Sequence, residues 1–447
     1  MTGLVYAEGY GCPSNDYDLE IILSRFEAEG YVRVTDPAEA DVVVVNTCAV
    51  KKVTEDRILS RLRLFEKMGK PVVVSGCLPL VNLDAVMKTI PSYVAMLSPA
   101  SVWRIDEVLR KKCQSRGMNL LKGSPRPKVG MVTPKDGSII EAIPVSEGCL
   151  GECAFCCTRL ARGRLVSCSP DSIVEAMRLG LRRGVREFWL TGQDVGAYGC
   201  DIGWCLPALL RRICSIEGEF KVRVGMMNPE WCIGRLEELI EAYRDSKVFN
   251  FLHLPLQSGN DEVLRTMKRG YAVQEFVKIV ERFRREYPDV TLWTDIICGY
   301  PTEDEDAFLD TLKVLKDVQP DVVNISRFSA RPRTPAQKLK PLPSEVVKER
   351  SRRASSLCRS ISLSRNSRWL GWSGEVLVDE KGRDGTWIGR TDSYKPVGLK
   401  GPEGLLGQRV SVRIVDAQPT HLVGMLVDSP TEAFGKGFLQ ADEGRGA

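Results

Sequence analysis

Gly148-Cys149-Leu-Gly-Glu-Cys153-Ala-Phe-Cys156 places three cysteines in a C-x3-C-x2-C spacing, in a loop that follows a predicted strand. Four thiolates saturate a 4Fe-4S cluster, whereas three leave one iron open to bind a small molecule. A zinc site normally has a fourth Cys or His in a paired spacing, and no matching second pair follows in the sequence nearby. Adjacent Cys157 could be a fourth ligand only by sharing a very tight loop with Cys156. The spacing therefore favours an iron-sulfur cluster over zinc.

The chain around this loop, from about residue 142 to residue 330, alternates strand-like runs with helical patterns. Such an alternation predicts a barrel or partial barrel of β/α units, which places its chemistry at the carboxyl ends of the strands. The predicted strands after the cysteine loop cover residues 186–190, 222–225, 249–254, 290–297 and 322–326.

The N-terminal part of the chain, about 110 residues, also alternates apolar runs with helical patterns and predicts a parallel α/β domain. Three of its predicted strands each end shortly before a cysteine. These cysteines are Cys12 after residues 4–7, Cys48 after residues 42–45 and Cys77 after residues 72–74. Because the carboxyl ends of parallel strands lie along one edge of a sheet, where ligands bind, the three thiols could converge in space.

The C-terminal part changes character to short strands split by Gly, Asp and Pro, which predicts a small antiparallel β-barrel. The 447 residues suggest about three domains, which we place at residues 1–115, 135–368 and 369–430. A linker rich in Gly, Pro, Lys and Arg is expected from about Gly117 to Pro134, and a mobile tail after Ser429. The predicted strands of the barrel cover residues 374–378, 386–389, 408–415 and 422–427.

Composition narrows the possible functions. Apolar and charged fractions of 43% and 27% are those of ordinary globular proteins. No apolar run approaches the roughly 20 residues of a membrane span, and the N-terminus does not resemble an export signal, so a cytoplasmic protein is expected. Fifteen cysteines against two histidines favour metal or redox chemistry that depends on sulfur.

A basic stretch covers residues 331–368, where eleven Lys and Arg residues accompany only Glu345 and Glu349. Such an excess of cations suits a polyanion such as RNA, although a solvated helix face is an equal alternative.

The C-x3-C-x2-C spacing, with an aromatic residue before its last cysteine, resembles the signature of the radical-SAM superfamily. The resemblance implies that the open iron chelates S-adenosylmethionine. One electron from the cluster then cleaves the sulfonium and gives methionine and a 5′-deoxyadenosyl radical. In such enzymes the cofactor supplies the reactivity, and the protein supplies placement and the exclusion of water.

Motifs along nearly the whole chain narrow this resemblance to the radical-SAM methylthiotransferase family. Three of them resemble the N-terminal domain of that family, which binds an auxiliary 4Fe-4S cluster: Gly9-Tyr-Gly-Cys12-Pro-Ser-Asn15, Asn46-Thr-Cys48-Ala-Val50 and Ser75-Gly-Cys77. Others are similar to its radical-SAM motifs: Leu190-Thr-Gly-Gln-Asp194 with Gly196-Ala-Tyr-Gly199, His253-Leu-Pro-Leu-Gln-Ser-Gly259, Met267-Lys-Arg-Gly-Tyr271 and Thr294-Asp-Ile-Ile-Cys-Gly-Tyr-Pro-Thr-Glu303. The C-terminal barrel resembles a TRAM domain, an RNA-binding module.

Two further motifs, Cys156-Cys-Thr-Arg-Leu-Ala-Arg-Gly163 and Val224-Gly-Met-Met-Asn-Pro229, resemble the archaeal and eukaryotic branch of the family. That branch implies N6-threonylcarbamoyladenosine at tRNA position 37 as the substrate, converted to its 2-methylthio derivative. Two departures, Gly299-Tyr-Pro-Thr and Arg331-Pro-Arg-Thr, put loop details in doubt more than the chemistry. The resemblance also implies two partners, a tRNA anticodon arm and an electron donor protein of unknown identity.

The resemblance assigns Cys149, Cys153 and Cys156 to the cluster that binds S-adenosylmethionine. It assigns Cys12, Cys48 and Cys77 to the auxiliary cluster, whose open iron would hold the sulfur destined for the substrate. Without the resemblance, these last three could equally be small buried hydrophobes.

Other predicted site residues lie at strand ends and on basic segments. Gln193, Asp194, His253 and Asp295 are expected to contact S-adenosylmethionine at the barrel mouth, with hydrogen bonds to loop backbone as the alternative. Gly299 and Pro301 are expected to shape the loop beneath the nucleoside. The residues predicted to contact RNA are Arg352, Arg353, Trp387, Arg390, Tyr394 and Lys395, although an aromatic residue on a small barrel is more often core.

Three other functions remain open from the sequence. The same chemistry could act on isopentenyladenosine in tRNA, or on an aspartate of a ribosomal protein, although the Met226-Met-Asn-Pro229 segment argues against the protein substrate. A non-catalytic RNA-binding protein with a structural metal is the third.

Overall fold

The computed structural model describes residues 3–132 and 137–427. The chain divides into two compact units, Met1–Cys358 and Arg359–Ala447. The tail predicted after Ser429 lies outside the described residues, and the boundaries predicted for three domains stay predictions. Among the described residues, no helix combines the length and the apolar character needed to cross a lipid bilayer.

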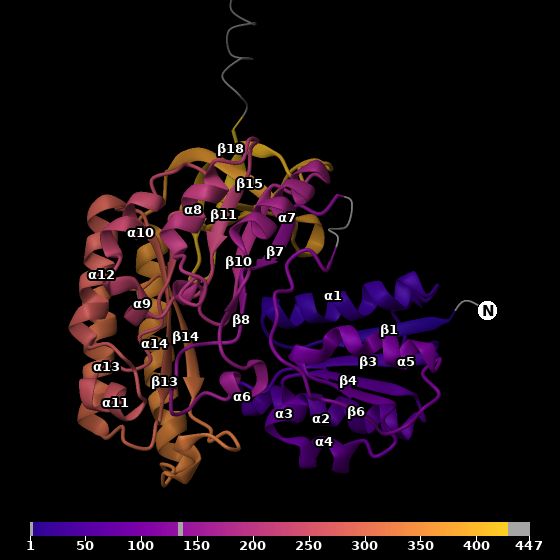
Figure 1. Cartoon of the computed structure of the whole chain (residues 1–447). Helices are drawn as coiled ribbons and strands as arrows, with labels where there is room; N and C mark the ends of the chain where they lie inside the picture. The colour runs from indigo at the N-terminus through magenta and orange to yellow at the C-terminus, as the bar shows by residue number, and fades with distance from the viewer. Residues whose placement is uncertain (1–2, 133–136, 428–447) are drawn as a thin grey trace, which may run out of the picture. The chain divides into compact units, whose positions relative to one another are not determined.

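The first unit begins with a six-stranded sheet in the order β2-β1-β3-β4-β5-β6, in which every pairing is parallel (Figure 1). The strands are β1 Leu4–Gly9, β2 Val32–Arg33, β3 Val42–Thr47, β4 Val72–Gly76, β5 Ala95–Leu97 and β6 Met118–Leu120. The helices are α1 Pro13–Ala28, α2 Lys52–Lys67, α3 Leu78–Val81, α4 Leu83–Thr89, the 3-10 helix η1 Pro99–Arg104 and α5 Ile105–Arg110. This confirms the predicted N-terminal α/β domain.

Helices cover both faces of this sheet because its central strands begin with continuous runs of valine. Val42 and Val44 of β3 pack with α1, η1 and α5, whereas Val43 and Val45 pack with α2, α3 and α4. Successive side chains of a strand point to opposite faces, so a continuous run of valines buries both sides of the sheet. The burial on both faces fixes the strand ends, and with them the three cysteines that follow.

A partial barrel of parallel strands follows in the first unit. One sheet has the order β11-β10-β7 and another has the order β12-β13-β14. A parallel bridge from Val222 to Val248 and a hydrogen bond from Met227 N–H to His253 O (2.9 Å) join β11 to β12. The strands are β7 Ile140–Pro144, β10 Glu187–Thr191, β11 Lys221–Val224, β12 Phe251–His253, β13 Thr291–Cys298 and β14 Val322–Arg327. The predicted partial barrel is therefore confirmed.

The remaining elements of this part cover the strands and connect them. The helices are α6 Thr158–Arg162, α7 Pro170–Arg182, α8 Leu206–Cys214, α9 Pro229–Ile233, α10 Leu236–Ala242, α11 Asp261–Thr266, α12 Val273–Glu286 and α13 Glu305–Val318. Helix α14 Ser344–Ser367 includes the boundary between the two units, which falls after Cys358. The short elements are β8 Ser146–Glu147, β9 Val166–Ser167 and the 3-10 helices η2 Val195–Ala197 and η3 Pro335–Lys338. The C-x3-C-x2-C loop lies between β8 and α6.

The second unit is a closed five-stranded barrel in the order β15-β16-β17-β19-β18. Its elements are β15 Ser373–Lys381, η4 Arg383–Gly385, β16 Trp387–Arg390, β17 Pro396–Leu399, β18 Arg409–Ala417 and β19 Leu422–Leu426. The predicted barrel is confirmed, with two differences: β17 was not among the predicted strands, and it pairs with β19 in parallel while the other four pairings are antiparallel. The chain leaves β17, runs back along β15 as β18 and closes the barrel as β19.

The linker predicted from Gly117 to Pro134 is partly wrong. Met118–Leu120 forms β6, an edge strand of the N-terminal sheet. Lys128 is only 2% exposed and its ammonium pairs with the carboxylates of Asp18 and Glu147. A composition of Gly, Pro and Lys indicates a loop, but it does not reveal a buried partner elsewhere in the chain.

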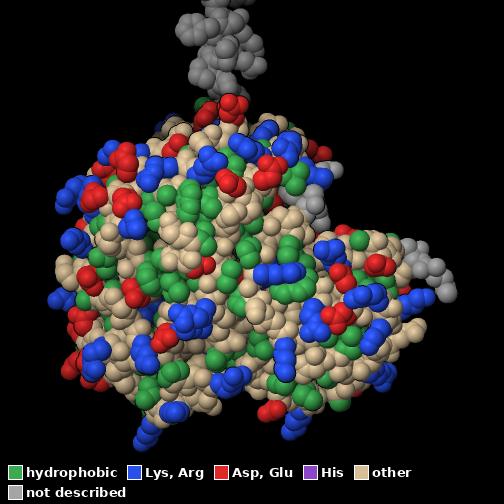
Figure 2. Space-filling view, viewed as in Figure 1, with side chains coloured by type: hydrophobic (Ala, Val, Ile, Leu, Met, Phe, Trp, Pro, Cys, Tyr) green, Lys and Arg blue, Asp and Glu red, His purple; other side chains and the backbone are tan. Residues whose placement is uncertain are grey.

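The outer helices of the first unit carry mixed charges rather than one basic surface. Figure 2 shows Lys and Arg side chains lying among Asp and Glu over the region of α10 to α13. The ion pairs there include Arg235–Glu238, Arg244–Glu286, Arg265–Glu262 and Arg282–Glu237. Exposed pairs of this kind keep a helix face solvated and add little stability. The helices α10 to α12 therefore do not supply a polyanion-binding surface.

The side chain of Glu141 on β7 carries a carboxyl group that is buried, which makes its ionisation unfavourable. Its Oε2 atom is buried without a hydrogen-bond partner among the described residues. Burial raises the pKa of Glu141 to about 8. The unfolded chain releases this proton near pH 4.5, whereas the folded chain keeps it until about pH 8, so rising pH in this window destabilises the fold.

We therefore expect Glu141→Gln, which keeps the shape but cannot ionise, to stabilise the protein at high pH. The free energy of unfolding should rise by roughly 4 to 5 kcal/mol at pH 8.5 and by less than about 0.5 kcal/mol near pH 4.5. Urea denaturation of both proteins at the two pH values measures this difference. Equal gains at both pH values would show that the proton is not the cause.

Candidate active site

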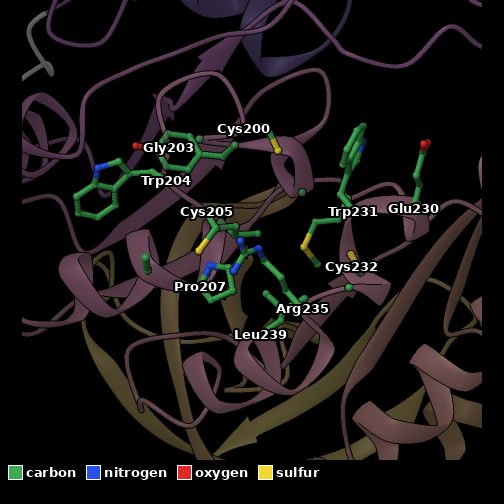
Figure 3. Close-up of a pocket in the computed structure, with 17 residues that line it drawn as sticks. Cys200, Gly203, Trp204, Cys205, Pro207, Glu230, Trp231, Cys232, Arg235 and Leu239 are labelled. Carbon is green, nitrogen blue, oxygen red and sulfur yellow. The ribbon is translucent and has the colours of Figure 1, made fainter.

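A cavity of about 920 Å³ lies beside the carboxyl ends of β10 and β11 (Figure 3). Trp204 and Trp231 lie at opposite sides of it, and Arg235 lies between them. Its lining includes Gly196 and Met227 but none of the six cysteines or polar residues predicted for the site. The residues predicted to bind the cofactors lie in the neighbouring loops and not in this cavity.

The C-x3-C-x2-C loop follows β8 and is shaped by Gly148. Gly148 has a positive φ of 79°, and a Cβ atom there would lie 2.1 Å from the carbonyl oxygen of Arg164, so only glycine is accommodated. Backbone N–H groups point at two of the sulfurs: Gly151 N–H donates to Cys149 Sγ (3.3 Å) and Thr158 N–H donates to Cys156 Sγ (3.4 Å). The loop thus presents its thiols to a common space lined by donors that favour thiolates.

The thiols of Cys149 and Cys156 are largely buried, and burial opposes their ionisation. Burial raises the pKa of Cys149 to about 12, and the carboxylate of Asp194 and the sulfurs of Cys156 and Cys153 add to the rise. Burial also raises the pKa of Cys156. Thiols of this kind become thiolates together only when a strongly cationic group binds them. The donor set fits an iron-sulfur cluster.

The N-terminal domain brings its three cysteines together at one edge of the sheet. Cys77 N–H donates to Thr47 O (2.8 Å), which places the ends of β3 and β4 side by side. A Cβ atom on Gly11 would lie 3.1 Å from Cys48 Cβ. Burial raises the pKa of Cys77 to about 12, Arg162 works in the opposite direction, and Cys48 and Cys12 add to the rise. These contacts place the three cysteines at the same edge of the sheet, and their role as ligands of one cluster stays a prediction.

Neither set of thiols has the geometry of a single-ion site. Among the residues that the structure describes, no three His, Cys, Asp or Glu side chains come close enough to bind one metal ion in common. In a 4Fe-4S cluster each thiolate binds a different iron, so the ligands surround a cube and do not meet at one ion.

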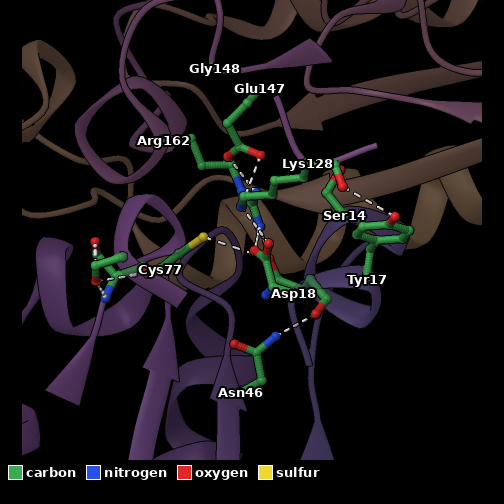
Figure 4. A network of polar contacts seen from close by, with 12 residues as sticks. Ser14, Tyr17, Asp18, Asn46, Cys77, Lys128, Glu147, Gly148 and Arg162 are labelled. Carbon is green, nitrogen blue, oxygen red and sulfur yellow. Dashed lines mark hydrogen bonds and ion pairs between the residues drawn. The ribbon is translucent and has the colours of Figure 1, made fainter. Parts of the chain in front are cut away.

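A buried network of charges joins the segment of the C-x3-C-x2-C loop, through Glu147 and Arg162, to the N-terminal domain (Figure 4). Arg162, at the end of α6, is 2% exposed. Its Nη2 donates to Asn15 Oδ1 (2.5 Å) and to Asp18 Oδ2 (2.8 Å), and its Nη1 donates to Glu147 Oε1 (2.6 Å). Lys128 completes the network by pairing with the same two carboxylates. Two cations thus neutralise two carboxylates in a region from which water is excluded.

Asn15 carries this network to the N-terminal cysteines. Its Nδ2 donates to Tyr10 O (2.7 Å) and Thr47 O (2.9 Å), and Cys77 Sγ lies 3.7 Å from its Oδ1. Although burial opposes it, the Arg162 and Lys128 cations hold the pKa of Glu147 below its usual range. Arg162 follows Cys156 by six residues in the sequence, and in the structure it contacts the same Asn15 side chain as Cys77 does.

Gln193 and Asp194 make the backbone contacts that the sequence left as the alternative to ligand binding. Gln193 Oε1 accepts from Gly148 N–H (2.6 Å), and its Nε2 donates to Ser14 Oγ (3.2 Å). Asp194 is buried, and its Oδ1 accepts from Asn228 N–H (3.0 Å). Burial raises the pKa of Asp194 to about 6. Both side chains fix the cysteine loop and the end of β11 against β10.

His253 and Asp295 face each other at the open mouth of the barrel. His253 Nε2 and Asp295 Oδ2 are 2.8 Å apart, and Asn324 Nδ2 donates to Asp295 Oδ1 (3.0 Å). Burial favours a higher pKa for Asp295, but the hydrogen bond and charge of His253 outweigh it, so the pKa lies below its ordinary value. Their side chains are 16% and 29% exposed, so this pair remains open to a ligand.

Arg269 is a site residue that the sequence did not single out, although it lies within the quoted motif Met267-Lys-Arg-Gly-Tyr271. Its Nη1 donates to Cys153 Sγ (3.2 Å) and its Nη2 donates to Asn228 Oδ1 (2.7 Å). Arg162 was missed in the same way, within Cys156-Cys-Thr-Arg-Leu-Ala-Arg-Gly163. In both motifs the arginine itself could have indicated a site residue, because a cation close to thiolates stabilises their negative charge.

The loop predicted to lie beneath the nucleoside is fixed by Gly299. Gly299 has a φ of 78°, and a Cβ atom there would lie 2.5 Å from Val347 Cγ2. Its N–H donates to Glu303 Oε2 (2.7 Å), and Glu303 in turn pairs with Arg350 (3.0 Å). The part assigned to Pro301 in the same loop stays a prediction.

The RNA contacts predicted on the small barrel are not supported for Trp387, Tyr394 and Lys395, which are only 7%, 4% and 3% exposed. Trp387 Nε1 donates to Pro402 O (3.0 Å), and Lys395 Nζ donates to Asn366 Oδ1 (2.7 Å). Arg390 is held by the carboxylate of Asp379 (2.8 Å). Trp387 belongs to the barrel core because alternate residues of β16 point into the barrel, and Tyr394 is buried in the turn between β16 and β17.

The basic stretch of residues 331–368 is also less available than its composition suggests. Arg331 and Arg350 are buried and pair with Glu55 and Glu303. Arg353 pairs with Glu305 (2.7 Å), whereas Arg352 is exposed on α14. Several of these cations therefore stabilise the fold, and only part of the stretch faces solvent.

Comparison with known proteins agrees with this geometry. The model of the Radical SAM superfamily matches residues 143–315, that of Uncharacterized protein family UPF0004 matches residues 4–98, and that of the TRAM domain matches residues 373–427. The fold resembles the radical S-adenosylmethionine methyltransferase TsrM from Kitasatospora setae, solved with cobalamin and a [4Fe-4S] cluster, with a TM-score of 0.55, 14% identity and coverage of 75% of this chain and 74% of that one. The fold and the cysteine loop thus define a radical-SAM enzyme with a C-terminal TRAM domain.

Relatives of known name narrow the class. A probable threonylcarbamoyladenosine tRNA methylthiotransferase of Pyrococcus horikoshii is 42% identical over 95% of this chain and 99% of its own length. A threonylcarbamoyladenosine tRNA methylthiotransferase of Drosophila melanogaster is 36% identical over 96% of this chain and 78% of its own length. The chain belongs to the threonylcarbamoyladenosine tRNA methylthiotransferase family.

Proposed function

We propose that this enzyme converts N6-threonylcarbamoyladenosine at position 37 of tRNA to its 2-methylthio derivative. One structural observation carries the proposal: a buried network through Arg162 joins the segment of the C-x3-C-x2-C loop to the edge of the N-terminal sheet where Cys77 lies. A reaction that both generates a radical and inserts sulfur needs both sets of thiols close together. The names of the relatives supply the nucleoside.

Both thiol sets fit an iron-sulfur cluster by their chemistry. Cys149, Cys153 and Cys156 would hold the cluster that binds S-adenosylmethionine, and Cys12, Cys48 and Cys77 would hold the auxiliary cluster. When bound, the first cluster supplies the electron that cleaves S-adenosylmethionine, and the second supplies an open iron for sulfur. The resemblance of the N-terminal motifs to the family supports the second assignment.

The chain's own residues position the reactants. Gln193 connects the cysteine loop to Ser14 of the N-terminal domain and so fixes one thiol set relative to the other. The His253–Asp295 pair is partly exposed at the barrel mouth, where it would hydrogen-bond S-adenosylmethionine or the substrate. Arg162 keeps a positive charge beside Cys77 and Cys12, which favours thiolate at the auxiliary site.

The proposed partners are a tRNA anticodon arm and an electron donor protein. Exposed Arg352 is a candidate contact to RNA phosphate, and Arg353 would be one only by exchanging its pair with Glu305. We also propose a cytoplasmic location, because all fifteen cysteines are free and a reducing compartment maintains thiols.

An anaerobic reconstitution tests the proposed function. The protein, loaded with iron and sulfide, is given S-adenosylmethionine, a reductant and tRNA bearing either threonylcarbamoyl- or isopentenyl-adenosine, and the nucleosides are measured by mass spectrometry. We expect a 2-methylthio product only from the threonylcarbamoyl tRNA. A product from isopentenyl tRNA, or from ribosomes supplied in place of tRNA, would assign the enzyme to another substrate.

Arg269 should set the reduction potential of the first cluster. Its hydrogen bond to Cys153 Sγ stabilises negative charge on the sulfur, and a reduced cluster is the more negative state. Replacing it by leucine (Arg269→Leu) should therefore lower the midpoint potential by an amount on the order of tens of millivolts. A redox titration followed by electron paramagnetic resonance measures the shift.

Arg265→Leu is the matched control, because Arg265 lies in the same segment but is exposed and pairs with Glu262. It should leave the potential at the wild-type value. Equal midpoint potentials in the wild type and in Arg269→Leu would show that Arg269 does not affect the potential of the cluster.

A further inference from the structure

Residues 331–336 follow β14 and run into the short helix η3. We call them the brace segment. Connections usually run over the surface of a protein. Here, however, the side chains of Arg331, Thr334 and Ala336 are all buried, and Thr334 Oγ1 donates to Arg331 O (2.8 Å). A connection with this much buried side-chain surface must pack against other parts of the chain.

Arg331 holds the segment that follows Cys48. Its Nη2 donates to Oε2 of Glu55, a buried carboxylate in the first turn of α2. Glu55 Oε1 also accepts from Asn82 Nδ2 (2.9 Å). Although burial opposes it, the hydrogen bond and the charge of Arg331 hold the pKa of Glu55 below its ordinary value. Because a buried ion pair is strongly unfavourable to break, this pair joins the brace segment firmly to the start of α2.

Arg333 reaches the segment that follows Cys77. Its Nη1 donates to Leu80 O (3.0 Å), on α3. The backbone of Arg333 has a φ of 65°, a left-handed conformation that favours glycine and is strained in other residues. Its N–H donates to Gln337 Oε1 (2.8 Å), which holds the backbone in this conformation. An arginine kept where glycine would be easier indicates that its side chain has a role.

The brace segment also holds the C-x3-C-x2-C loop. Ala336 N–H donates to Ala154 O (2.9 Å), in the middle of that loop. Ala336 belongs to a buried apolar cluster, and Phe155 of the loop packs against the same cluster. One short stretch of chain therefore contacts three segments that carry predicted cluster ligands.

Cys157 adds a direct contact between two of these segments. It follows Cys156, and its Sγ donates to the carbonyl oxygen of Ala49 (3.3 Å), the residue directly after Cys48. Arg331 lies beside the same thiol. The thiol that the sequence allowed as a fourth ligand thus contacts the N-terminal domain instead.

We propose that the brace segment fixes the distance between the two sets of thiols, with Arg331 and Arg333 as its positioning residues. It shares no residue with the Arg162 network and so restrains the two sites independently. A reaction that combines a radical from one site with sulfur from another depends on their separation, since an error of about 1 Å can lower a rate on the order of 100-fold. The inference rests on the proposed function for the presence of two clusters.

Two variants of the full-length holoenzyme test the proposal. Arg333→Gly removes the side-chain contact but suits the left-handed backbone, so the fold should be retained. The double variant Arg331→Met/Glu55→Gln removes the ion pair without leaving a buried charge. Electron paramagnetic resonance of the reduced protein measures the magnetic interaction between the two clusters, which should be weaker in both variants. Lys338→Ala is the control, since Lys338 is exposed on η3, and it should match the wild type.

The amount of S-adenosylmethionine cleaved per methylthio product separates positioning from stability. Radical formation needs only the first cluster, so both variants should form 5′-deoxyadenosine at the wild-type rate. Methylthio product should fall roughly ten-fold or more, and the ratio of 5′-deoxyadenosine to product should rise by the same factor. A loss of stability alone would lower both products together and would appear as a lower urea midpoint.

An unchanged magnetic interaction and an unchanged product ratio in both variants would overturn the brace, and so would equal changes in Lys338→Ala. Failure of the proposed function would look different. If the wild type has two interacting clusters but forms no methylthio product on threonylcarbamoyl tRNA, while both variants weaken the interaction, the brace stands and the substrate assignment falls. A wild type with a single cluster would overturn both.

Discussion

Replacing Cys12, Cys48 and Cys77 together by alanine should abolish methylthio transfer while leaving the cleavage of S-adenosylmethionine intact. The iron content of anaerobically reconstituted protein should fall from about eight to about four atoms per chain, because one of two clusters is lost. Formation of 5′-deoxyadenosine reports the remaining cluster, and mass spectrometry of the tRNA reports sulfur insertion. The two activities should separate completely.

Cys113→Ala is the matched control for this experiment. Cys113 belongs to the same N-terminal domain and is buried, but it lies near Tyr31 and away from the converging thiols. It should retain both clusters and full activity. An unchanged iron content in the triple variant, or sulfur insertion without the three cysteines, would remove the auxiliary cluster from the account.

Replacing Arg162 by methionine should have the second largest effect, on stability. The variant keeps the bulk of the side chain but leaves the buried carboxylates of Asp18 and Glu147 with Lys128 as their cation. Breaking a buried ion pair by removing one partner typically costs about 3 to 5 kcal/mol. A shift of the urea midpoint of the first unit measures the loss.

Arg159→Met on the same helix provides the comparison. Arg159 pairs with Glu152, whose side chain is 69% exposed, so its loss should cost less than about 1 kcal/mol. Equal urea midpoints for Arg162→Met and Arg159→Met would mean that the buried network does not stabilise the fold. The auxiliary thiols should also bind iron less completely in Arg162→Met, because a cation beside Cys77 is lost.

The arrangement of the strands could be predicted because the decisive signals are local. The valines of β3 are buried on both faces, and a continuous apolar run of that length is typical of a strand inside a parallel sheet. Once such strands are placed, the cysteines that follow them must lie on one edge. The parallel topology, more than any individual contact, brings the thiols together.

Charge pairs between distant segments could not be predicted. Nothing in the sequence near Lys128 or Arg162 indicates that both meet Asp18, since the contacts join residues 110 and 144 positions apart. Composition described Lys128 as part of a linker. Only the packing of the N-terminal domain against the cysteine loop converts these residues into a buried network.

Which residues of the small barrel point inward and which point outward could also not be predicted from the sequence. In β16, Trp387 and Ile388 are adjacent and both apolar, so the alternation does not show which of them points inward. Strand β17 was missed because Pro396 opens it and Gly398 interrupts it, two residues that usually indicate a turn. Residues 396–399 form a strand because they pair with β16 and β19, and this pairing is not encoded in the four residues alone.

The most direct test of the central claim is the nucleoside composition of tRNA from cells that lack this protein. Mass spectrometry should find that 2-methylthio-N6-threonylcarbamoyladenosine is lost while its precursor without the methylthio group accumulates. Restoring the gene should restore the product, and a copy with Cys12, Cys48 and Cys77 replaced should not. Unchanged levels of the methylthio nucleoside in the deletion strain would contradict the account.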